Sequence, residues 1–171
     1  AIEILGRAPD MSKVPNASDW WRERHIIIRR FIKKKAYDRA YELASAHRQN
    51  SGLPFAQAEW LSGWLALRKL NRPRMAFQHF ERLFRNVSSP ISRARGAYWA
   101  GLAARELKQN EVAQAWFMSA AAHDETFYGQ LAVMALDGQR PADKALRPQI
   151  TAQMLAQYSA QDMAVAAGVL S

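Results

Sequence analysis

A fixed spacing of 37 residues is the feature that most constrains how this chain can fold. Four residue pairs keep this spacing: Ala66 with Ala103, Leu70 with Leu107, Ala76 with Ala113, and Phe80 with Phe117. They flank two turns that read LNRPRMA and LKQNEVA. Periods of roughly 20 to 50 residues are typical of arrays in which each unit buries its apolar face against the next unit. We therefore predict an all-α fold, an α-solenoid or superhelix of stacked antiparallel helix hairpins similar to tetratricopeptide arrays.

The composition agrees with a helical domain and excludes several classes of site. Hydrophobic residues make up 49% of the chain, yet the alternating Val, Ile and Thr runs that mark strands are almost absent. No apolar run approaches the roughly 18 to 20 residues that would span a bilayer. The chain has no cysteine, and none of its four histidines lies three or four residues from another. We therefore predict no metal site and no cofactor.

Helix-start signals divide the sequence into three parts of one helical domain fragment, residues 1–171. Residues 1–18 are predicted to hold the end of a preceding helix and a loop, residues 19–137 the hairpin repeats, and residues 138–171 a loop and terminal helices. Ser89 before Pro90 and, further on, Asn110 are predicted to cap helices. Gly129 inside a helix costs about 1 kcal/mol relative to alanine, so a neighbouring element is predicted to pack against its backbone.

Positive charge is concentrated in the first half of the chain. Residues 1–85 carry 17 Lys and Arg against 8 Asp and Glu, whereas residues 86–171 carry 7 of each, so the net charge of +9 belongs to the first half. The densest basic stretch includes Arg24, and our candidates for binding an anionic polymer are Arg22, Arg29, Arg30, Lys33, Lys34, Lys35, Trp20 and Trp21. The tryptophans are included because adjacent helical residues point about 100° apart, so that one of the two can face outward.

Three interpretations of this basic stretch remain open. A solvated face is the first, and attraction of an anionic polymer is the second. Nucleic acid is a distant third, because no row of exposed aromatic side chains interleaves with the charges and no polar pairs recur as in helical repeats that read single bases.

Four segments carry a resemblance to a known family. They are AYELASAH at 40–47, AEWLSGWLALRKL at 58–70, PISRARGAYWAGLAA at 90–104 and TFYGQLA at 126–132. Their order and spacing resemble the soluble lytic transglycosylases, bacterial periplasmic enzymes that cleave peptidoglycan glycan strands. The resemblance implies a superhelical scaffold, a periplasmic location, peptidoglycan as a partner, and a lysozyme-like catalytic domain that follows the helices and is missing from this chain.

The resemblance does not extend to catalytic residues. The family's catalytic glutamate is followed by serine, and a GLMQ-type segment comes later, but neither motif occurs here. Glu59 lies among tryptophans and is the best candidate for a carboxyl group with a shifted pKa, although a single carboxyl group in such a place is more often a structural hydrogen-bond partner. No catalytic residue is therefore assigned. Tyr128 and Gln130 are candidates for contact with the catalytic domain, with plain helix packing as the alternative.

The predicted function is thus a non-catalytic superhelical scaffold that positions the catalytic domain and confines glycan strands. Tryptophans could stack on sugar rings, but the helical spacing of Trp60, Trp64, Trp99 and Trp116 favours packing in the core. The alternative is a free-standing helical-repeat adaptor that binds a protein or peptide. An adaptor should present polar residues outward on the first helix of each hairpin, and those helices are apolar on both sides in this sequence.

Overall fold

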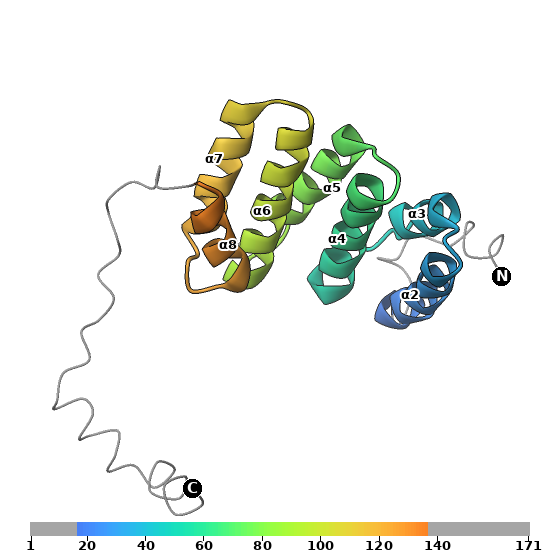
Figure 1. Ribbon diagram of the computed structural model, residues 1–171. Coiled ribbons are helices and arrows are strands. Elements are labelled where there is room, and N and C mark those ends of the chain that lie inside the picture. Colours follow the sequence, from blue (N-terminus) through green and yellow to red (C-terminus); the bar gives the residue numbers. More distant parts are fainter. Residues whose placement is uncertain (1–16, 137–171) are drawn as a thin grey trace, which may run out of the picture. The chain divides into compact units, whose positions relative to one another are not determined.

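A computed structural model describes residues 17–136 of the protein, and all regular structure in this range is helical (Figure 1). The helices are α2 (Ala17–Lys33), α3 (Tyr37–Ser45), α4 (Gly52–Arg68), α5 (Pro73–Arg85), α6 (Pro90–Glu106), α7 (Asn110–Ala121) and α8 (Phe127–Ala135). The all-α prediction is confirmed for these residues. The predicted preceding helix and the terminal helices lie outside them. No helix in the described range is long and apolar enough to cross a membrane.

Each helix packs against the next one in the chain, and alternate helices also touch. The helix α2 contacts α4, α4 contacts α6, and α6 contacts α8. The first helices of successive hairpins therefore touch one another directly. Short turns join α2, α4 and α6 to the second helices α3, α5 and α7 (Figure 1). We call α2, α4, α6 and α8 the first-helix layer.

The turn inside each hairpin repeats the same backbone geometry. Lys35, Asn71 and Lys108 follow α2, α4 and α6, and their φ angles are 58°, 51° and 60°. The amide after the first and third of these residues bonds back to the helix, from Ala36 N to the Phe31 carbonyl (2.9 Å) and from Gln109 N to the Ala104 carbonyl (3.0 Å). This is the left-handed helix ending that satisfies terminal carbonyls. The left-handed turn thus occurs in the first hairpin as well, although the residue pairs at 37-residue spacing did not include that hairpin.

A ring packed on a glycine explains one of the matched pairs. A Cβ atom placed on Gly63 would lie 2.5 Å from the ring of Phe80, and one on Gly101 would lie 2.6 Å from the ring of Phe117. The two phenylalanines are 0% and 4% exposed. The second helices α5 and α7 thus each press a ring against the bare backbone of the first helix in their hairpin, and any larger residue at either glycine would push the two helices apart.

The predicted caps and close approaches are mostly as expected. The Ser89 hydroxyl accepts a bond from the Ser92 amide (3.3 Å), which confirms it as a cap. Gly129 packs against the His123 carbonyl so closely that a Cβ atom would overlap it, which confirms the predicted approach. Asn110 is not a cap: it is the first residue of α7, because the left-handed Lys108 leaves Gln109 in the cap position.

Candidate functional site

The predicted basic stretch forms an exposed face of α2 and of the turn that follows it. Arg22, Arg29, Arg30, Lys33, Lys34 and Lys35 are all exposed. Arg22 lies 3.6 Å from Asp19, and no carboxylate among residues 17–136 pairs with the other five. The face is charged and hydrated, which fits both a solvated surface and attraction of a polymer.

Two residues of this stretch are buried instead. Arg24 is 2% exposed, and its guanidinium donates to the carbonyls of Leu43 (2.8 Å) and Ala46 (2.9 Å), so it caps the end of α3. Trp21 is 3% exposed, and its indole N–H donates to Gln57 Oε1 (2.9 Å). Trp20 is half-buried. Of the two adjacent tryptophans, only Trp20 reaches the surface, and Trp21 has no face on which a ligand could stack.

The most concentrated ionisable cluster is a buried group that we call the Glu59 network, consisting of Tyr41, His47, Glu59, His79 and Arg82. Glu59 on α4 is 3% exposed. Its carboxylate accepts from His79 Nδ1 (2.6 Å), His47 Nε2 (3.3 Å), Arg82 Nε (3.0 Å) and Arg82 Nη2 (3.2 Å). The network therefore joins α4, α5 and the segment after α3 around one carboxylate.

The remaining contacts indicate which ring nitrogens donate. The Gln49 amide donates to His47 Nδ1 (2.9 Å), so the nitrogen of His47 that can donate to Glu59 is Nε2. His79 Nε2 lies 3.0 Å from the Tyr41 hydroxyl, which donates to it when Nδ1 carries the proton for Glu59. Arg82 Nη2 also lies 2.8 Å from His79 Nδ1, and because both are then donors, the guanidinium proton is directed to Glu59.

The Glu59 network is built to hold a charge rather than to move a proton. Burial by itself raises the pKa of Glu59, but the hydrogen bonds from His47, His79 and Arg82 outweigh it and hold that pKa well below its ordinary value. A general acid for glycoside cleavage needs a raised pKa and access to the sugar. Glu59 has neither, so the structure agrees with its assignment as a structural hydrogen-bond partner.

A second cluster lies on the first-helix layer, and we call it the aromatic–cation surface. It consists of Trp60, Trp64, Arg68 and Lys69 at α4 and of Arg95 and Trp99 on α6. The rings of Trp60 and Trp64 stack at 6.4 Å, and the ring of Trp99 meets Trp60 edge-on at 6.1 Å. All three tryptophans pack against the core and remain half-buried, which fits the predicted core role of this stripe while leaving part of each ring outside.

Each cation of this surface lies over a ring. The guanidinium carbon of Arg95 is 5.5 Å from the centre of the Trp60 ring, and that of Arg68 is 5.5 Å from the Trp99 ring. Lys69 Nζ is 5.2 Å from the Trp64 ring. No carboxylate in the described range forms an ion pair with these three cations. Cation–π contacts stabilise the cations without cancelling their charge.

Three donors at this surface have no hydrogen-bond partner within residues 17–136: Trp60 Nε1, Arg95 Nε and Trp99 Nε1. Burial lowers the pKa of Arg95, and Tyr128 partly opposes that shift. Sequence reasoning singled out the tryptophans but not Arg95. The available signal was its spacing, since Arg95 and Trp99 lie four residues apart and so share one face of the helix.

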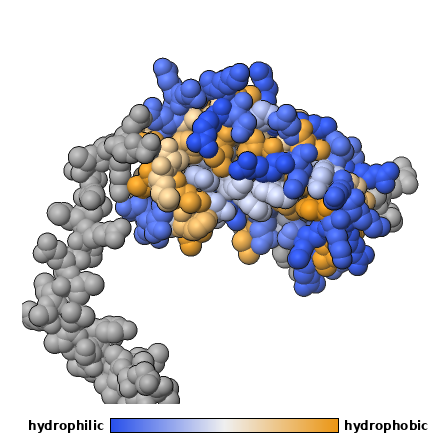
Figure 2. Space-filling view, in the orientation of Figure 1, coloured by the Kyte–Doolittle hydropathy of each residue, from blue (hydrophilic) through white to orange (hydrophobic). Residues whose placement is uncertain are grey.

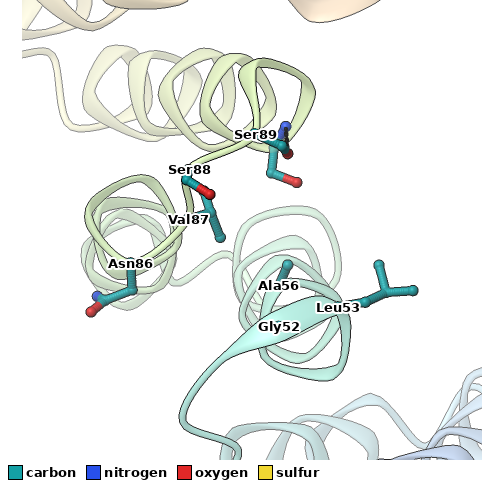
Figure 3. Close-up of a pocket in the computed structure, with 8 residues that line it drawn as sticks. Gly52, Leu53, Ala56, Asn86, Val87, Ser88 and Ser89 are labelled. Atoms are coloured by element: carbon teal, nitrogen blue, oxygen red, sulfur yellow. Dashed lines mark hydrogen bonds between the residues drawn. The ribbon is translucent and has the colours of Figure 1, made fainter.

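A shallow hollow lies at the start of α4 and beside the α5–α6 turn (Figure 3). Its volume is about 280 Å³. Ala56 and Val87 point toward each other across it, whereas Leu53 points away. Its lining is glycine, alanine, leucine, valine, asparagine and serine. With no ionisable side chain in the lining, the hollow offers no side chain that could act as an acid or a base.

The predicted domain contacts lie near the α8 end of the described helices. The ring of Tyr128 packs on Tyr98 at 5.8 Å, and Gln130 is exposed. Phe127 and Met134 are 67% and 75% exposed, and apolar atoms show at the surface around this end in Figure 2. No group of three or more metal-ligating side chains occurs in the described part of the chain.

No protein-family model, no curated protein and no solved structure matches this chain.

Proposed function

We propose that this chain is a non-catalytic superhelical segment of a periplasmic lytic transglycosylase acting on peptidoglycan, where it positions a lysozyme-like catalytic domain and confines glycan strands. One observation supports the proposal above others. Three of the segments that carry the family resemblance, 58–70, 90–104 and 126–132, fall on α4, α6 and α8. These helices touch one another in the first-helix layer. Three of the four segments that resemble the family thus lie on one layer, and the fourth, 40–47, lies on α3 and directly after it.

The solenoid arrangement is part of the same proposal. Left-handed turns recur at residues 35, 71 and 108, and rings press on glycines at two of the three hairpins. Both features recur at intervals of 36 to 38 residues, and both position a second helix against a first helix. In a helical-repeat array each unit contacts only its neighbours, and the stacked helices present extended surfaces to a partner.

The scaffold role is tested by incubating this chain with purified murein sacculi. We expect the protein to sediment with sacculi at low salt, to be released as salt rises, and to liberate no soluble fragments. Release of glycan fragments by this chain would refute the non-catalytic role. A native polypeptide with no lysozyme-like domain would refute the assignment to this enzyme family.

An adaptor that binds a protein or peptide is the alternative, and the aromatic–cation surface favours it. Its tryptophans and uncompensated cations lie on α4 and α6, where an adaptor would present its binding residues. Recovery of one tight protein partner, without retention on sacculi, would favour the adaptor.

A further inference from the structure

We propose that the aromatic–cation surface binds a carboxylate of an acidic peptide, with Arg95 as the anchoring residue. The inference goes beyond the scaffold role and does not depend on the enzyme family. It rests on three features of the surface: cations that no carboxylate pairs with, donors without acceptors, and aromatic rings that remain partly exposed.

The charge of this surface is unmatched. Arg68, Lys69 and Arg95 lie over rings, and no ion pair compensates any of them in the described range. On the neighbouring second helix the situation differs, since Arg82 bonds Glu59 and Arg85 bonds Glu81 (2.7 Å). An anion that approached α4 and α6 would therefore meet positive charge over low-dielectric ring surfaces, where its attraction is stronger than in water.

The unpartnered hydrogen-bonding groups of this surface also favour an anion, because they are donors. Trp60 Nε1, Arg95 Nε and Trp99 Nε1 are buried donors that lack partners among the described residues, so the region beneath the surface has an excess of donors over acceptors. The terminal NH₂ groups of Arg95 make no hydrogen bond within the described residues, and the Arg95 side chain is half-buried rather than fully closed off from solvent. A guanidinium can hold a carboxylate through two parallel N–H bonds.

The ring environment favours a peptide carboxylate over a phosphate. Arg95 has the only charged group among the three unpartnered donors, and the other two donors are neutral indoles, which suits the single negative charge of each carboxylate. The half-buried rings of Trp60 and Trp99 offer apolar contact for the carbon chain and for an aromatic neighbour in the ligand. An acidic peptide that carries an aromatic residue beside its carboxylate matches both requirements.

The test uses two short peptides, acetyl-Glu-Tyr-Glu-amide and its neutral match acetyl-Gln-Tyr-Gln-amide. Binding is measured by calorimetry and by the indole N–H signals in nitrogen–proton spectra. The chain has six tryptophans, so six such signals are expected, and Trp60→Phe and Trp99→Phe variants assign two of them. We expect the acidic peptide to shift the Trp60 and Trp99 signals of the unmodified protein and the neutral peptide to leave them in place.

Arg95→Gln and Arg93→Gln form the matched pair of variants, because both remove one positive charge from α6. Arg93 lies over the Phe84 ring, away from the unpartnered indoles. We expect Arg95→Gln to weaken binding of the acidic peptide about tenfold or more, and Arg93→Gln to change it less than about twofold.

Three results would overturn the proposal. These are equal losses in the two variants, displacement of the peptide by an equal concentration of inorganic phosphate, and indole signals in the unmodified protein that do not move. The first two would mean general attraction of anions, and the third would mean that the surface binds no acidic peptide. The third measurement needs no variant, so a failure of Arg95→Gln to fold would not block the test.

Discussion

The Glu59 network and the aromatic–cation surface both include α4, through the adjacent residues Glu59 and Trp60. They differ in whether a carboxylate compensates their positive charge. Glu59 faces α5 and gathers two imidazoles and the Arg82 guanidinium around one buried carboxylate. Trp60 faces α6, where the Arg95 guanidinium lies over its ring with no carboxylate. In the first region no buried donor lacks a partner, whereas in the second region three buried donors do.

This difference separates a structural device from a surface that is open for binding. A satisfied buried network fixes the geometry of the helices that contribute to it, and it gains nothing from a further ligand. A set of unpartnered donors lowers stability, and a ligand that supplies acceptors recovers the loss. The following predictions test whether the two regions differ in this way.

Glu59→Gln should have the largest effect. The amide keeps the shape of the side chain but removes the charge that His79 and Arg82 bond, and Gln cannot accept from all of its donors at once. Removing one partner of a buried ionic network costs about 3 kcal/mol in free energy of unfolding, with some relief here because the Arg82 side chain is 52% exposed. Urea denaturation of both proteins measures this loss.

The control is Glu81→Gln on α5. Glu81 pairs with Arg85 at the surface, so its loss should cost less than about 1 kcal/mol. Equal midpoints for the two variants would show that the Glu59 network is not a structural device, and the contrast between the two regions would then be lost.

The second largest expected effect is a loss of free energy of unfolding at acid pH. The pKa of Glu59 is lower in the folded protein than in the unfolded chain, where it is about 4.3. The resulting stability is present above that unfolded value and is lost as the pH falls through it toward the folded pKa. We expect the unmodified protein to lose its advantage over Glu59→Gln as the pH is lowered from about 6 to 2. A constant difference between the two proteins over that range would contradict this assignment.

Tyr41→Phe tests a residue of the same network that contacts His79 rather than Glu59, and its expected effect is smaller. The variant removes the hydroxyl that donates to His79 Nε2, at 3.0 Å, and leaves a buried nitrogen without its partner. The expected cost is about 1 kcal/mol in free energy of unfolding. Tyr37→Phe is the matched control, because Tyr37 is half-buried and contributes its ring to a Lys69 contact that the variant retains. Similar losses in both variants would remove Tyr41 from the network.

The sequence predicted the helices well because their determinants are local. Pro73 and Pro90 mark helix starts, and the apolar positions of α4 follow two faces. The first hairpin was predicted as part of the repeats, but the residue pairs at 37-residue spacing did not include it, because its matching feature is backbone geometry, a left-handed Lys35, rather than residue identity. Arg24 was placed in a basic face because charge alone does not reveal two carbonyls at the end of another helix.

The candidate site was less predictable for the same reason. Glu59 was correctly interpreted as a hydrogen-bond partner from its apolar surroundings, but its partners are 12, 20 and 23 residues away in sequence, and no local pattern names them. The role of Arg95 depends on which ring it covers and which acceptors are missing. Both facts arise only once α4 and α6 are packed together.

Arg95→Met should have the smallest effect on stability, and it tests the comparison most directly. Like Glu59→Gln it removes one formal charge, but it also removes a buried donor that has no acceptor. The lost cation–π contact costs about 0.5 to 1 kcal/mol, and relief of the unpartnered Nε offsets it by a similar amount. The free energy of unfolding should therefore change by less than about 1 kcal/mol in urea denaturation, while binding of the acidic peptide is lost. A loss as large as that of Glu59→Gln would instead make Arg95 a structural group, and the two regions would no longer differ in kind.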